Sequence, residues 1–284
     1  MGTDMLVASW LFAISSVLYL ALIVELIIDD GSRAGEIVEL NNYAQLVSAI
    51  LFFFGSCYFV YVSYPEAVEK AWGEMQATDL SNMSWLQRYF TGNDFLKATW
   101  FFCLASTPYL VDAINIIAVE PGSYVGYAFF VGVSIYFMAL SIWVLGCMPE
   151  NMVANDGRGS SLFFDYIFSN LCCCTFSCKP EEFWRKHFGA DFLAGSWIFF
   201  ICSACSVPIS IFEVISTSGA DPYYWLMLAM TVGFTAGAGL FVVTSYPENM
   251  MTTKVYDSLC ACCTDTHGKR SEDDGNAEET ADLL

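Results

Sequence analysis

Long apolar stretches separated by shorter polar ones dominate the pattern of this chain. Six of these stretches are about 20 residues long or more, which lets a helix cross roughly 30 Å of hydrocarbon at 1.5 Å per residue. The pattern therefore predicts six membrane-spanning helices, over residues 5–28, 43–64, 95–118, 123–147, 192–215 and 223–246.

The six predicted helices form three copies of one unit. Trp10, Trp100 and Trp197 each stand early in an apolar stretch, with an aspartate six residues before and a serine six residues after. The second stretch of each unit ends at Pro-Glu, at 65–66, 149–150 and 247–248. Self-similarity of this kind marks a repeat architecture. We expect an all-α integral membrane protein of three tandem two-helix repeats, over 1–66, 94–150 and 191–248, with connections 67–93 and 151–190 and a tail over 249–284.

Composition and the placement of basic residues support this class and orient it. A hydrophobic content of 56% excludes a soluble domain of this size. Of the eleven lysines and arginines, only Arg33 lies in a connection on the side opposite the termini, so the positive-inside rule predicts that both termini are cytosolic. We expect the first helix to be a retained span and not a cleavable signal peptide, because it is full-length and lacks a short, basic-flanked apolar region. We expect a multi-pass protein of the plasma membrane or an endomembrane of a eukaryotic cell, with the lipid bilayer as its main partner.

The formal charge of −19 gathers partly in the last fourteen residues, which should form a solvated tail. Such an acidic chain does not attract nucleic acid. The tail ends in an acidic dileucine pattern, in which Glu279, Leu283 and Leu284 would dock on a vesicle-coat adaptor. The alternative interpretation is an acidic tail that only aids solubility.

Seven of the twelve cysteines fall in two predicted cytosolic clusters, which argues against a disulfide framework. Both clusters follow short aromatic or apolar stretches, and thiols at the bilayer surface are typical sites of S-palmitoylation. Four of these thiolates could instead hold one zinc ion, although the spacing is imperfect. A third interpretation is that they are inert. The clustered cysteines are Cys172, Cys173, Cys174, Cys178, Cys260, Cys262 and Cys263.

Three carboxylates lie within the predicted odd-numbered spans, toward their outward ends. Asp112, Glu25 and Glu213 are ion-binding candidates because an ionisable side chain in the membrane costs at least a few kcal/mol. If the units pack around a threefold axis, these acids would form a ring near the outer mouth. Alternatively, Glu25 and Glu213 are interfacial acids near helix ends, and only Asp112 is costly to bury.

The repeated unit resembles the YrhK-like domain, a small two-helix membrane module. The residues that carry the resemblance are Asp94-Phe-Leu-x₃-Trp100-Phe-Phe-x₃-Ser106 and, in the first unit, Leu51-Phe-Phe-Phe-Gly-Ser-Cys-Tyr-Phe59 followed by Pro65. The Gly-Ser pair is kept at Gly55-Ser56 and replaced in the other units. The resemblance implies the two-helix architecture, in three tandem copies, and no particular chemistry.

Two functions fit these patterns. One is a channel or transporter for protons or small cations, with Asp112 as the main site and Glu25 and Glu213 as attracting charges. The other is a palmitoylated membrane organiser or trafficking scaffold without transport activity. No nucleotide loop, nucleophile-base pair or histidine-rich metal motif appears, so we expect neither an enzyme nor a cofactor or resident metal. The candidate protein partners are further copies of the same chain, in a homo-oligomer, and the vesicle-coat adaptor.

Overall fold

The computed structural model describes residues 3–30, 36–77, 79–122, 124–154, 161–162, 189–219, 221–246, 249 and 254–255. Regular structure in this part of the chain is helical, without strands. The six long helices are α1 (Asp4–Asp30), α2 (Glu36–Val62), α4 (Asp94–Val119), α5 (Tyr124–Gly146), α10 (Asp191–Ser216) and α11 (Pro222–Thr244). Shorter helices are α3 (Pro65–Ala77), η1 (Leu80–Asn82), η2 (Gln87–Thr91) and α6 (Pro149–Met152).

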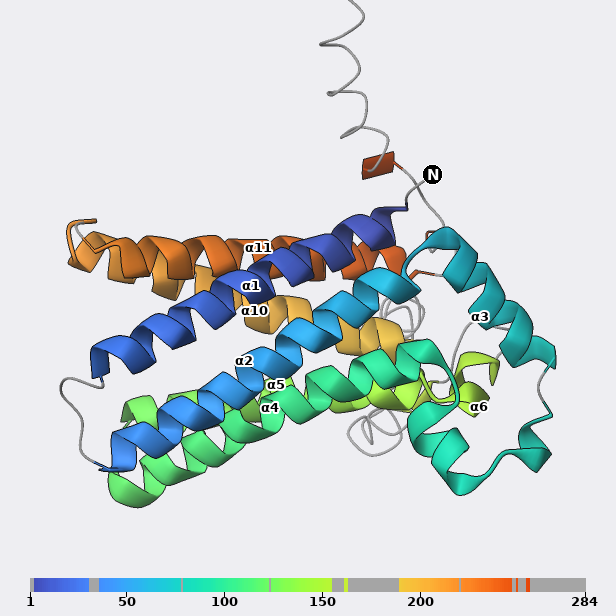
Figure 1. Cartoon of the computed structure of the whole chain (residues 1–284), viewed down its shortest axis with the longest axis horizontal. Coiled ribbons are helices and arrows are strands. Elements are labelled where there is room, and N and C mark those ends of the chain that lie inside the picture. Colours follow the sequence, from blue (N-terminus) through green and yellow to red (C-terminus); the bar gives the residue numbers. More distant parts are fainter. Residues whose placement is uncertain are drawn as a thin grey trace, which may run out of the picture.

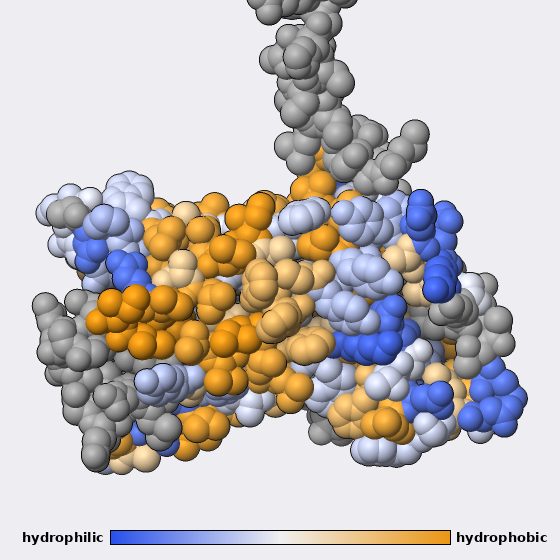
Figure 2. Space-filling model, viewed as in Figure 1, coloured by the Kyte–Doolittle hydropathy of each residue, from blue (hydrophilic) through white to orange (hydrophobic). Residues whose placement is uncertain are grey.

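All six long helices are long and apolar enough to cross a membrane, as the sequence predicts. In Figure 2 an apolar band covers the middle of the bundle, and polar side chains gather toward both ends. These features define an integral, multi-pass α-helical membrane protein.

The helix boundaries follow the repeated sequence positions. Helices α1, α4 and α10 begin at the three aspartates that precede the tryptophans, and α2, α5 and α11 end three residues before the Pro-Glu dipeptides. The fixed φ of proline suits the first position of a helix, and Pro65 and Pro149 accordingly begin α3 and α6. Pro247 and Glu248 lie outside the described residues.

Helix α2 begins at Glu36, earlier than the predicted span, which starts at residue 43. Its first turns, Glu-Ile-Val-Glu-Leu-Asn-Asn, are partly polar, so hydrophobicity alone did not mark them as part of the helix. The apolar part of the helix, Tyr43–Val62, agrees with the predicted span.

The six long helices close into a ring in which each packs against two others. Around the ring the order is α1, α2, α4, α5, α10 and α11, and α11 returns to pack along α1. Figure 1 shows the helices running roughly along the long axis, with the N-terminus and α3 at the right. We call this the N-terminal end of the bundle, and the opposite end, where α4 joins α5, the turn end.

Small residues allow close approach where the first and last helices meet. A Cβ atom on Gly237 of α11 would lie 2.6 Å from Cδ2 of Phe12 and 3.2 Å from the carbonyl oxygen of Ala8, both on α1. A Cβ atom on Gly233 would overlap Oγ of Ser15, also on α1. Gly233 and Gly237, four residues apart on one face of α11, therefore let α1 and α11 pack closely.

Nine aromatic side chains fill the centre of the ring. Phe12, Phe102 and Phe199 each stand two residues after a repeated tryptophan, and each is almost fully buried. Each packs against two aromatic rings from the second helix of a neighbouring hairpin, with centroids 4.9–5.4 Å apart. Those partners lie six and thirteen residues before each Pro-Glu: Phe59 and Phe52, Trp143 and Tyr136, Phe241 and Phe234.

Hydroxyl pairs join the two helices within hairpins near the N-terminal end. The Oγ atoms of Ser9 and Ser63 lie 2.7 Å apart, and those of Ser196 and Ser245 lie 3.0 Å apart. These serines stand one residue before a repeated tryptophan and two before a Pro-Glu. Each hydroxyl carries one proton, so in each pair one serine donates to its partner, and the partner donates to the backbone carbonyl oxygen four residues earlier in the chain. These buried polar groups are therefore satisfied.

Candidate functional site

The three predicted acids lie in different environments. Asp112 on α4 is 4% exposed, Glu213 on α10 is half-buried, and Glu25 on α1 is exposed. Asp112 stands seven residues before the end of α4, or about 10 Å along the helix. Its burial and its depth make Asp112 the main feature of the site.

One hydrogen bond from a neighbouring hairpin holds the Asp112 carboxylate. Nε2 of Gln45, on α2, donates to Oδ2 at 3.2 Å. The other oxygen, Oδ1, is buried and has no hydrogen-bond partner among the described residues. Because a carboxylate can accept about four hydrogen bonds, most of its capacity is unused.

A tyrosine pair lies beside this carboxylate. Tyr19 of α1 is stacked on Tyr109 of α4, with ring centroids 6.1 Å apart. The Tyr19 side chain lies near Ser48 and Asp112, and its hydroxyl is buried without a hydrogen-bond partner among the described residues. Three helices of two hairpins, α1, α2 and α4, thus contribute polar groups to one cluster, which we call the Asp112 cluster: Asp112, Gln45, Tyr19, Tyr109 and Ser48.

Glu25 and Glu213 gather at the turn end of the bundle around another tyrosine. Both lie in the neighbourhood of Tyr223, near the start of α11. Oε2 of Glu213 is buried and lacks a hydrogen-bond partner in the described part of the chain. Tyr223 also lies on the side of Tyr19, which belongs to the Asp112 cluster. That the three acids act together stays a prediction.

The aromatic core lies directly next to the Asp112 cluster, toward the N-terminal end. Tyr19 packs against Phe52 of this core, with centroids 6.3 Å apart. Phe52 contacts Phe102 and Phe234, which belong to the other two hairpins. Aromatic side chains therefore occupy the centre of the bundle on one side of the cluster.

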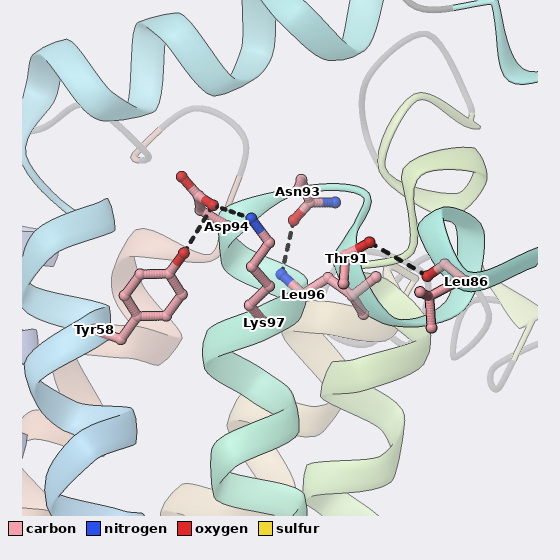
Figure 3. Close-up of polar contacts among 7 residues, drawn as sticks. All are labelled: Tyr58, Leu86, Thr91, Asn93, Asp94, Leu96 and Lys97. Atoms are coloured by element: carbon pink, nitrogen blue, oxygen red, sulfur yellow. Dashed lines mark hydrogen bonds and ion pairs between the residues drawn. The ribbon is translucent and has the colours of Figure 1, made fainter. Parts of the chain in front are cut away.

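Repeated acids at the N-terminal end have structural partners. Oδ1 of Asp94 accepts hydrogen bonds from Tyr58 at 2.8 Å and from Lys97 at 2.7 Å (Figure 3). Asn93 caps the same helix by accepting from the backbone N–H of Leu96 at 2.7 Å. Oδ1 of Asp4, at the start of α1, accepts from the backbone N–H of Val255 at 2.8 Å. These acids stabilise helix starts and join segments that are distant in the sequence, which is a structural role.

Sequence reasoning missed Gln45, Tyr19 and Tyr109. Gln45 and Asn115 are the only side-chain amides in the six predicted spans, so their rarity was a usable signal. Tyr19 and Tyr109 both stand nine residues after a repeated tryptophan, where the third unit has Ser206. The packing order of the helices, which hydropathy does not reveal, was needed to place them beside Asp112.

The clustered cysteines, Cys172 to Cys178 and Cys260 to Cys263, lie outside the described residues, as do Glu279, Leu283 and Leu284. Four cysteines within the long helices, and Cys147 directly after α5, are free thiols. No group of three or more metal-binding side chains occurs in the described part of the chain. The zinc interpretation falls on the cysteine clusters and is therefore not tested.

The ring of six spans defines a multi-pass α-helical membrane protein with a buried carboxylate inside it. Comparison with known proteins adds no assignment, because no family model, curated protein or solved structure matches the chain.

Proposed function

We propose that this protein moves protons or small cations across the membrane, with Asp112 as the binding site. The proposed architecture is three tandem two-helix repeats with both termini in the cytosol. The observation that supports the proposal is the Asp112 carboxylate, which is 4% exposed and has one oxygen without a hydrogen-bond partner among the described residues.

The charge of Asp112 has no counter-ion within the spans. The six long helices contain no arginine or histidine, and their one lysine, Lys97, stands at the opposite end of α4. A buried carboxylate without a cationic partner is costly in a membrane, and such groups mark ion and proton pathways. A proton or a small cation supplied from outside the protein would neutralise the charge.

The oxygen atoms around Asp112 suit either occupant. Gln45 holds one carboxylate oxygen in place and leaves the other free to accept a proton or bind a cation. Tyr19 and Ser48 add hydroxyl oxygens, which are ligands that hard cations accept. Glu25 and Glu213 would raise the local cation concentration near the turn end.

The aromatic core favours a gated pathway over a permanently open pore. Phe12, Phe102 and Phe199 are almost fully buried against rings of neighbouring hairpins. An ion that enters from the turn end would reach the Asp112 cluster and stop at these rings. Passage requires a conformational change that moves hairpins relative to one another, as in alternating access.

Flux through reconstituted protein tests the proposal. Proton and monovalent-cation flux would be measured in liposomes that contain the full chain, the Asp112→Asn variant or a control, Asp221→Asn. Asparagine preserves the shape of Asp112 and removes its charge, so we expect flux in the native chain and none above empty liposomes in Asp112→Asn. Asp221 is an exposed carboxylate that caps α11, and asparagine also caps well, so the control should keep full flux. Equal flux in all three proteins, or none in the folded native chain, would reject Asp112 as the transport site.

A second candidate is a palmitoylated membrane organiser, and the same aromatic core supports it. A centre filled with aromatic side chains suits a rigid scaffold as well as a closed transporter. Under this alternative the two cysteine clusters carry acyl chains, each of which adds about 0.8 kcal/mol of membrane affinity per buried CH₂. Hydroxylamine-sensitive acyl exchange that disappears when the seven clustered cysteines become serine, combined with an absence of flux, would favour this function.

The proposed orientation and relationship have their own tests. Asn82 and Ser84 form a glycosylation pattern in an exposed segment at the N-terminal end, and cytosolic placement keeps it unmodified. Glycan attached to Asn82 in eukaryotic cells would mean that the topology is the reverse of the one proposed.

Replacing Leu283 and Leu284 with alanine should change the membrane location if the dileucine acts in sorting. The relationship to the YrhK-like domain stays a proposal that rests on the short motifs of the first two units.

A further inference from the structure

A short helical segment before α4 presents large apolar side chains outward. Trp85 is 67% exposed and Leu86 is 56% exposed. They begin a helical stretch over 85–91, most of which is the π-helix η2. We call residues 84–92 the Trp85 segment, and Figure 2 shows apolar side chains at the lower right, over the short helices that precede α4.

Local hydrogen bonds fix the start of the Trp85 segment. Oγ of Ser84 accepts from the backbone N–H of Gln87 at 3.3 Å, and Oε1 of Gln87 accepts from the backbone N–H of Ser84 at 3.0 Å. This reciprocal pair is a capping box, which sets where the helical stretch begins. Trp85 and Leu86 are therefore exposed on an ordered framework.

The polar side of the segment is attached to the rest of the protein. Nε of Arg88 lies 3.2 Å from Oε2 of Glu150 on α6. Gly92 fits tightly, because a Cβ atom there would lie 2.5 Å from Cγ of Pro149. With its polar side facing the protein, the segment turns its apolar side outward.

An aromatic column connects this apolar side to the lipid-facing surface of α4. Trp85 packs on Phe90 at 5.3 Å, and Phe90 stacks on Trp100 of α4 at 4.9 Å. Nε1 of Trp100 also donates to the carbonyl oxygen of Tyr89 at 2.7 Å. Leu104, one turn further along α4, is 50% exposed and faces the lipid. The column thus continues an apolar stripe of a membrane-spanning helix.

We propose that the Trp85 segment lies in the bilayer interface, with Trp85 and Leu86 inserted among the headgroups and upper acyl chains of the leaflet at the N-terminal end. The depth agrees with this assignment, because Trp100 stands six residues after the start of α4, or about 9 Å along the helix. Tryptophan is enriched at this depth because its ring is amphipathic. The exposed side chains of Trp85 and Leu86 therefore contact lipid. This placement does not depend on the proposed transport function.

Quenching by brominated lipid tests this placement. Tryptophan fluorescence would be measured for the reconstituted full chain and for Trp85→Phe, and the difference would give the emission of Trp85. We expect phosphatidylcholine brominated near the headgroup to quench this difference more strongly than the same lipid brominated near the chain ends. Both leaflets carry the quencher, so the orientation of the reconstituted protein does not affect the result.

Trp143→Phe provides the matched control because Trp143 is 1% exposed in the core. The emission of Trp143, obtained as the difference between the native chain and Trp143→Phe, should be quenched neither by the two brominated lipids nor by aqueous iodide. Emission of Trp85 that responds to iodide and to neither brominated lipid would place it in water and overturn the proposal. Emission that resists all three quenchers would mean that protein covers Trp85, which would overturn it equally.

Discussion

Gly237 is a position at which one methyl group tests the packing of the helix ring. An alanine Cβ atom there would lie 2.6 Å from Cδ2 and 2.8 Å from Cε2 of Phe12. It would also lie 3.2 Å from the carbonyl oxygen of Ala8, a backbone atom of α1. Phe12 cannot move aside easily, because it is fully buried among the rings of Phe102, Phe199 and Phe241.

Gly132 on α5 is the matched control, because no atom lies within 4 Å of the Cβ position there. Glycine to alanine within a helix ordinarily stabilises it by about 0.5–1 kcal/mol, and this contribution is common to both variants. Overpacking a filled core costs about 1–3 kcal/mol. We therefore expect Gly237→Ala to be less stable than Gly132→Ala by about 1–3 kcal/mol.

Titration with a denaturing detergent from mild micelles would measure both free energies of unfolding, with circular dichroism as the readout. Comparison of the two variants removes the effect of alanine on the helix itself. Gly237→Ala that is as stable as Gly132→Ala would mean that α1 and α11 do not approach as closely as the structure indicates, and the closed ring would be wrong.

Two further predictions concern the N-terminal end of the bundle. Asn93→Ala removes the cap of α4 and the bond from Nδ2 to the carbonyl oxygen of Cys147, so it should lower the free energy of unfolding by about 1–2 kcal/mol in the same titration. The control, Asp221→Ala at an exposed cap, should cost about 0.5–1 kcal/mol. Equal costs would contradict the buried role of Asn93. Arg88→Gln breaks a partly exposed ion pair with Glu150 and should lower the free energy of unfolding by less than about 1 kcal/mol. A larger decrease would mean that this pair fixes the Trp85 segment more strongly than its exposure suggests.

The sequence was sufficient to predict the six spans and many of their ends. An apolar stretch of 20 residues in lipid is expected to form a helix, because every backbone polar group must be satisfied internally. The repeated aspartates then mark the starts of α1, α4 and α10. Asp112 was also recognisable, since a carboxylate far from the helix ends is rare in a membrane.

The pairing of Asp112 with Gln45 was not predictable in the same way. The two residues are 67 positions apart and belong to different hairpins. Spans that are apolar on all sides carry no polar stripe to show which face points inward. The signal that could have revealed the inner face was the spacing of aromatic residues, because Phe59, Trp143 and Phe241 each stand six residues before a Pro-Glu.

The interlocking of the aromatic core also determines where the ring can open. Phe12, Phe102 and Phe199 each pack against the second helix of a neighbouring hairpin, so any opening at the centre must separate hairpins. Two of the three interfaces between hairpins join segments that follow each other along the chain. The third, between α1 and α11, joins the first and last long helices without a covalent connection. Separation at this interface stretches no connection, and Gly237 lies within it. Under the proposed transport function, we therefore expect the core to open by a movement of α1 against α11.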